Sequence, residues 1–128
     1  MPKIREKYPH VTLSVFYGFD AARKFYPAWM DDLEKRLEAE PGVTVHGWVG
    51  QERLAEEYLR SDALVYPSVM PSGEAFTETY CISVVEALAA GCFVMSADHG
   101  ALREHPLTAF GRLPTFDHEA LFQLFAFW

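Results

Sequence analysis

Short apolar runs alternate with longer helix-forming stretches along most of the chain, and this alternation restricts the fold more than any other feature. Runs rich in β-branched and aromatic residues predict strands over residues 11–17, 43–49, 63–67 and 92–97. The stretches that predict helices are 21–40, 51–61, 78–90, 101–105 and 120–127. Because each strand is a continuous apolar run, the pattern is typical of a mostly parallel sheet covered by helices on both faces. We therefore expect a single α/β domain over residues 1–128, with ligands at the carboxyl ends of its strands.

Charge and composition narrow the classes of partner. The net charge of −7 carries no cluster of Lys and Arg, which argues against nucleic acid or an anionic membrane as the main partner. No window approaches the roughly 20 apolar residues of a membrane span. Cys81 and Cys92 lie in apolar runs without a CxxC or a nearby His set, which favours small buried side chains over a disulfide or a metal site. We predict a cytoplasmic protein without a metal or cofactor.

Two glutamates lie in the most apolar predicted helix. Glu78 and Glu86 stand eight residues apart, and on the helical wheel Thr79, Ser83 and Glu86 fall on one narrow polar stripe. A carboxylate on a helix that is apolar nearly all round needs a partner. Glu86 is therefore either the rim of a solvent-facing stripe or a ligand-binding residue.

Several other polar residues have simpler interpretations. The segment Asp98-His99-Gly100 follows a predicted strand and is either a turn or a contact to a ligand. His46 lies within a predicted strand, which favours a packed histidine over a catalytic one. No GxGxxG follows a strand, which counts against a dehydrogenase.

The order of the motifs is similar to that of a known enzyme family. The motifs are Gly47-Trp48-Val49, Leu54, Tyr58, the run 62–68 (DALVYPS), Glu78-x7-Glu86 and the run 87–91 (ALAAG). Together they resemble the C-terminal domain of a GT-B retaining glycosyltransferase of the family 4 type, also called group 1. The resemblance extends from about Val11 to Phe122. It implies a Rossmann-like three-layer sandwich that binds a nucleotide-sugar donor.

The resemblance also implies individual roles along that donor. It assigns Glu86 to the ribose hydroxyls, Glu78 to the sugar, the backbone N–H groups of Thr79, Tyr80 and Cys81 to the sugar or diphosphate, and Trp48 and Val49 to the neighbourhood of the base. Two residues eight apart on one helix are separated by about 12 Å along its axis, on the order of the span from a ribose to a sugar. A helix N-terminus also offers free N–H groups to a diphosphate.

The resemblance leads to a further expectation about the extent of the chain. The family domain normally begins with an earlier strand and a loop whose Arg and Lys neutralise the diphosphate, and Met1-Pro2-Lys3-Ile4 matches neither. We therefore expect a donor-binding half that lacks its first strand and is inactive without an N-terminal domain or subunit. The alternative is a non-catalytic interaction module, a relic of the donor domain that pairs with a partner chain through its sheet edge or its aromatic C-terminus.

Overall fold

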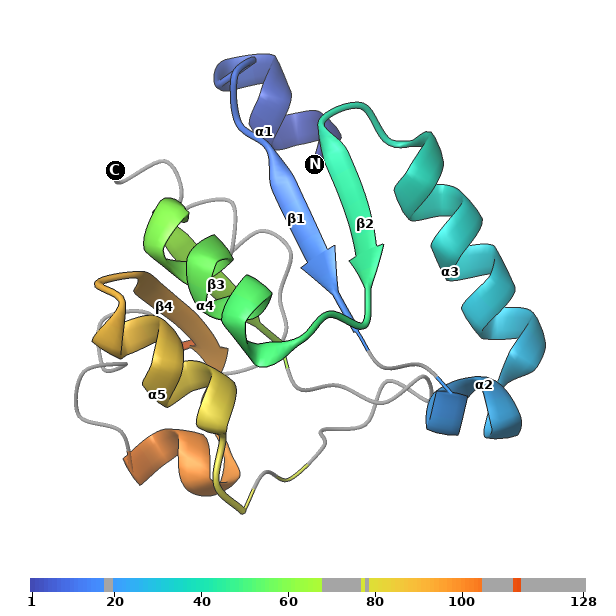
Figure 1. The fold of residues 1–128 in the computed structure, drawn as a ribbon. Coiled ribbons are helices and arrows are strands. Elements are labelled where there is room, and N and C mark those ends of the chain that lie inside the picture. Colours follow the sequence, from blue (N-terminus) through green and yellow to red (C-terminus); the bar gives the residue numbers. More distant parts are fainter. Residues whose placement is uncertain (18–19, 68–76, 78, 105–111, 114–128) are drawn as a thin grey trace. The chain divides into compact units, whose positions relative to one another are not determined.

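The computed structural model describes residues 1–17, 20–67, 77, 79–104 and 112–113. The chain divides into two compact units, Met1–Gly50 and Gln51–Trp128. Short strands paired in parallel alternate with helices in both, which confirms the predicted α/β class (Figure 1). The single domain over residues 1–128 stays a prediction.

The first unit is a parallel strand pair with a long helix beside it. Its elements are α1 (Pro2–Lys7), β1 (Leu13–Phe16), α2 (Asp20–Phe25), α3 (Pro27–Ala39) and β2 (Val43–Gly47). β1 and β2 pair from Leu13 opposite Val43 onward, and α3 packs against β2 (Figure 1). Met30 on α3 is fully buried and anchors the unit's apolar interior. His46 stacks on Phe16 with ring centroids 4.6 Å apart, which confirms that it is a packed histidine.

The stretch 21–40, predicted as helix-forming, contains two helices that meet at Tyr26. Pro27 is the first residue of α3, where its fixed φ suits the helix and its missing N–H costs no hydrogen bond. This confirms the expected place of the proline. The sequence patterns did not predict α1, which has Pro2 in its first turn and buries only Ile4.

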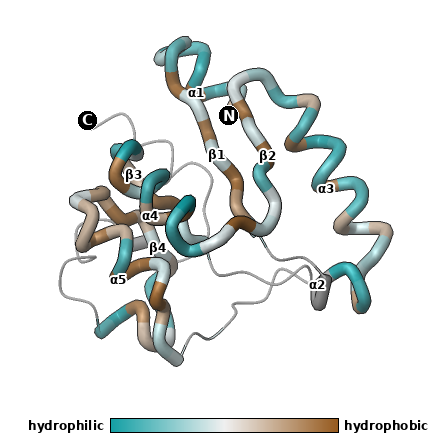
Figure 2. The backbone as a smooth tube through the Cα atoms, viewed as in Figure 1, coloured by the Kyte–Doolittle hydropathy of each residue, from teal (hydrophilic) through white to brown (hydrophobic). Residues whose placement is uncertain are grey.

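The second unit contains the most apolar part of the chain. Its elements are α4 (Gln51–Arg60), β3 (Ala63–Tyr66), α5 (Ile82–Ala89), β4 (Phe93–Ala97), the 3-10 helix η1 (Gly100–Glu104) and β5 (Arg112–Leu113). β4 pairs in parallel with both β3 and β5. α5 packs against β3 and β4, and α4 packs against α5. Figure 2 shows hydrophobic residues along β3 and β4 and mainly hydrophilic residues along α4.

The core of the second unit is formed by side chains from α4, α5, β4 and η1 and by the residues just before α5 and β4. Its members are Tyr58, Cys81, Val84, Ala87, Cys92, Val94, Ala97 and Leu102. Both cysteines are buried thiols, as the sequence predicts. The Cys92 Sγ donates to the carbonyl oxygens of Tyr58, at 3.1 Å, and Ser61, at 3.3 Å. Burial raises the pKa of the Cys92 thiol, and the Asp62 carboxylate raises it further.

Two predicted boundaries are wrong. α5 begins at Ile82 and not at residue 78, because Cys81 enters the core with an extended backbone (φ −89°, ψ 94°) and the helix starts only after it. β2 ends at Gly47, whose φ of 66° turns the chain, so Trp48 and Val49 lie beyond the strand. The helix predicted at 120–127 lies outside the described residues. In the described part of the chain, no helix combines the length and the apolar character needed to cross a bilayer.

Gly42 joins α3 to β2 in a conformation that only glycine adopts readily. Its φ is 79°, and a Cβ at this position would meet the guanidinium of Arg5, which donates to the Val11 carbonyl at 2.6 Å. We expect Gly42→Ala to lower the free energy of unfolding by about 1–2 kcal/mol through backbone strain. Loss of the Arg5 hydrogen bond adds about 1 kcal/mol.

Gly47→Ala is the matched control, because Gly47 also has a positive φ and open space around it. Chemical denaturation should show the larger loss for Gly42→Ala, and the excess should vanish when both are measured in an Arg5→Ala background. Equal losses for the two glycines in the wild-type background would contradict the proposed clash.

Candidate functional site

The polar side chains of α5 face polar side chains of α4. Gln51 and Tyr58 stand seven residues apart on α4, and Ser83 and Glu86 stand three apart on α5, so each pair shares one helix face. The Gln51 Nε2 donates a hydrogen bond to the Glu86 Oε1. Tyr58 and Ser83 form a second polar pair, and their interaction lowers the pKa of the Tyr58 hydroxyl. We call these four residues the α4–α5 polar seam.

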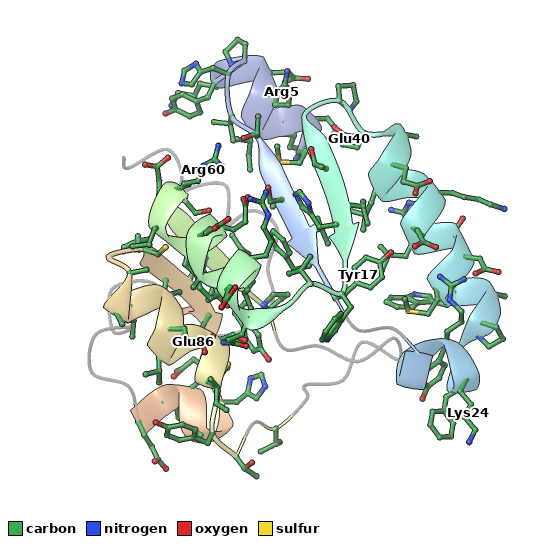
Figure 3. The ribbon with its side chains drawn as sticks, viewed as in Figure 1. Arg5, Tyr17, Lys24, Glu40, Arg60 and Glu86 are labelled. Atoms are coloured by element: carbon green, nitrogen blue, oxygen red, sulfur yellow. The ribbon has the colours of Figure 1, made fainter. Side chains whose placement is uncertain are left out.

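Glu86 is the acidic member of the seam and the only acidic residue of α5. It is half-buried and lies in the middle of the helix (Figure 3). An ionised carboxylate has two oxygens and about four sites for hydrogen-bond donors, and Gln51 occupies one of them. Glu86 therefore has the protein partner that a carboxylate on an apolar helix requires, and it keeps capacity for further hydroxyl donors.

Tyr58 is the buried end of the seam, with 9% of its surface exposed. Burial raises the pKa of its hydroxyl, the hydrogen bond with Ser83 lowers it, and the Glu86 carboxylate raises it again. The tyrosine therefore stays neutral near pH 7. It acts as a hydrogen-bonding group that fixes α4 against α5.

The chain that leads into α5 is exposed except at Cys81. Thr79, Tyr80 and Ile82 are exposed, with 63% of the Tyr80 surface accessible. Cys81 is the N-cap residue, and no side chain caps the helix. Because the helix starts at Ile82, the N–H groups that lack an acceptor inside it are those of residues 81–84. The sequence placed these groups two residues earlier, and the correction follows from the burial of Cys81.

The other residues assigned to the donor are not members of the α4–α5 polar seam. Glu78 lies outside the described residues, so its separation from Glu86 stays a prediction, and Thr79–Cys81 are not helical. Trp48, with 80% of its surface exposed, and Val49 belong to the first unit. The donor-binding roles of Glu78, Thr79, Tyr80 and Cys81 and the base-proximal roles of Trp48 and Val49 stay predictions.

The segment after β4 is a turn stabilised by an arginine. Gly100 has a φ of 56°, and the Arg103 Nε donates to the Asp98 carbonyl at 2.9 Å and lies 3.3 Å from the Asp98 carboxylate. The turn is thus confirmed, and a contact with a ligand there stays untested. Ser96, just before it on β4, is fully buried, and its Oγ has no hydrogen-bond partner in the described structure.

A network of hydrogen bonds and ion pairs lies just after the carboxyl end of β1 in the first unit. The Tyr17 hydroxyl donates to the Glu34 Oε1, and Arg23 bridges Asp31 at 2.8 Å and Glu34 at 2.7 Å. The sequence analysis did not identify this network. The signal was present, because Asp31 and Glu34 stand three residues apart on one face of a helix. Both ends of the Arg23 guanidinium are occupied by carboxylates.

Two further features do not add to the site. A pocket in the first unit is lined by Leu13 and Val43, the first residues of their strands, so it lies at the opposite edge from the one where parallel sheets bind ligands. Among residues 1–17, 20–67, 79–104 and the other described positions, no group of three His, Cys, Asp or Glu side chains could hold a metal ion.

The family is decided by a family model described as glycosyl transferases group 1, which matches residues 1–123. The chain belongs to this family. No curated protein and no solved structure matches it. Membership of the group 1 glycosyltransferases supports a role in glycosyl transfer and agrees with the short parallel strands of the fold.

In this glycosyltransferase chain, the sequence reasoning missed the partner of Glu86. It named Tyr58 only as a motif residue, and it did not single out Gln51. The spacing of seven between them on one predicted helix was the available signal, because such residues share a face that can meet a neighbouring helix. Which helix they would meet depends on packing that the pattern does not contain.

The pH dependence of stability tests the network around Tyr17. Partial burial, the hydrogen bond to Glu34 and the Glu34 charge raise the pKa of Tyr17 from 10.0 to about 12. Between these values the unfolded chain loses the phenolic proton while the folded chain keeps it, so the free energy of unfolding falls as pH rises from 10 to about 12. We expect the slope in this window to be smaller in Tyr17→Phe. Denaturant titrations at several pH values, with Glu34→Gln as a second variant that lowers the upper limit of the window, provide the measurement; an unchanged slope in both would contradict the network.

Proposed function

We propose that this group 1 glycosyltransferase binds a nucleotide-sugar donor and transfers the glycosyl group to an acceptor with retention of the anomeric configuration. In this proposal, the Glu86 carboxylate accepts hydrogen bonds from the ribose hydroxyls. The observation that carries the proposal is the half-buried carboxylate on α5, held at one oxygen by Gln51, in a chain of this family.

The chemistry of a carboxylate suits neutral hydroxyl donors. Hydrogen bonds from O–H groups to an ionised carboxylate are short and about twice as strong as those between neutral groups. No proton has to move, so the contact serves binding and orientation. We assign the sugar to Glu78, the diphosphate to the N–H groups at the start of α5, and the base to the neighbourhood of Trp48 and Val49.

Charge on the leaving diphosphate is the main electrostatic demand of the transfer. The positive end of a helix dipole favours phosphate at the N–H groups of residues 81–84. No metal or cofactor takes part in the proposed binding. In this proposal the acceptor is bound by a separate domain or subunit, and donor binding is the property measured here.

Glu86→Gln is the direct test. Gln keeps the shape of Glu86 and removes its charge, so we expect a loss of roughly 10- to 100-fold in donor affinity, in line with the 1.5–3 kcal/mol of a charged hydrogen bond. Isothermal titration with UDP-, GDP- and ADP-sugars measures it. Glu52→Gln removes the same charge from an exposed position on α4 and should leave the affinity unchanged. Absence of binding by the wild-type chain, or equal affinity in Glu86→Gln, would overturn the proposal.

The second candidate function is the non-catalytic interaction module. Three aromatic side chains at the junction of α2 and α3, those of Phe25, Tyr26 and Trp29, are exposed, and the Phe25 surface is 71% accessible. Exposed aromatic groups of this kind mark protein contacts. Under this alternative, Trp29→Ala weakens self-association or capture of a partner chain in sedimentation experiments, while Glu86→Gln has no effect on either.

A further inference from the structure

The hydrogen bond from Gln51 to Glu86 joins the first residue of one helix to the middle of another. Gln51 opens α4, and its Nε2 reaches the Glu86 Oε1 across 35 positions of sequence. Gln51 itself is exposed, so neither its burial nor a role in the core explains its place. In the described part of the chain, the hydrogen bond that its amide group makes is the one to the Glu86 carboxylate.

We propose that Gln51 is a positioning residue for donor binding, which rests on the proposed function of Glu86. The amide donor occupies one oxygen of the carboxylate and restricts its rotation. The Oε2 and the remaining lone pairs then stay available to a pair of neighbouring hydroxyl groups. The ligand class that fits is a ribonucleoside diphosphate derivative with both ribose hydroxyls free.

The rest of the seam keeps Gln51 in reach of Glu86. Two turns further along α4, Tyr58 pairs with Ser83 on α5 and is buried in the core with Val84 and Ala87. Leu54, between Gln51 and Tyr58, packs against the same core. The inward face of α4 is thus packed on α5 along its length. This packing holds the amide group of Gln51, the first residue of α4, within hydrogen-bonding distance of Glu86.

The expected effect follows from the cost of ordering a long side chain. Immobilising a flexible side chain on binding weakens affinity by about three- to tenfold. In the wild-type chain Gln51 has already ordered Glu86. In Gln51→Ala the ligand must order it, so affinity for the ribonucleotide falls by that factor.

The experiment compares two probes on four proteins. The probes are the nucleoside diphosphate that the wild-type chain binds, among UDP, GDP and ADP, and its 2′,3′-dideoxy analogue. The proteins are the wild-type chain, Gln51→Ala, Gln51→Glu and the control Glu52→Ala. Gln51→Ala should weaken the ribonucleotide about three- to tenfold and leave the dideoxy analogue unchanged. Gln51→Glu keeps the length and replaces the donor with an acceptor that repels Glu86, so its loss should be larger.

The two probes separate positioning from a general structural role. If Gln51→Ala weakens both probes equally, or neither, the positioning role is overturned while the proposed function stands. If the wild-type chain binds no ribonucleotide, the proposed function fails and the positioning role fails with it. Thermal unfolding of each variant shows whether it is folded, and the exposed position of Gln51 at the start of its helix favours folded variants.

Discussion

The packing of α4 on α5 is the interaction on which the candidate site depends. An apolar core that includes Tyr58, Val84 and Ala87 holds the two helices together, and two polar pairs run along the same contact. A hydrogen bond between side chains contributes only about 1 kcal/mol, whereas burying an apolar side chain contributes about 1.5–3 kcal/mol. The core therefore fixes the helices, and the Gln51–Glu86 pair leaves the second carboxylate oxygen of Glu86 available for a ligand.

The sequence predicted the elements of the fold better than their ends. Continuous apolar runs predicted four strands, and a proline predicted the first turn of α3 correctly. The start of α5 was wrong because periodicity treats Thr79–Cys81 as helical, while burial of Cys81 holds the backbone extended. A local sequence pattern contains no information about a backbone conformation that is imposed by packing in the rest of the core.

The candidate site was predictable in part for the same reason. The polar stripe on an apolar helix singled out Glu86, and the stripe correctly implied that Ser83 and Glu86 share a face. The stripe did not reveal that α4 covers that face, so the choice between solvent and ligand omitted a third partner, the Gln51 amide. Glu86 is half exposed and already hydrogen-bonded to Gln51. A position at the rim of a solvent-facing stripe and a role in ligand binding are both compatible with this arrangement.

Two arginines of the second unit are already paired with carboxylates, which bears on how a diphosphate could be bound. Arg53 is paired with Glu56, at 3.2 Å, and with Glu57, and Arg103 is paired with Asp98. A guanidinium already engaged by carboxylates offers less to a phosphate, because its N–H donors and its charge are partly satisfied. The backbone N–H groups of residues 82–84 lie at the start of α5, where no side-chain hydrogen bond caps the helix. Along this helix, positive potential at the N-terminus and a carboxylate one turn further on suit the two chemically different parts of one ligand, an anionic diphosphate and a neutral diol.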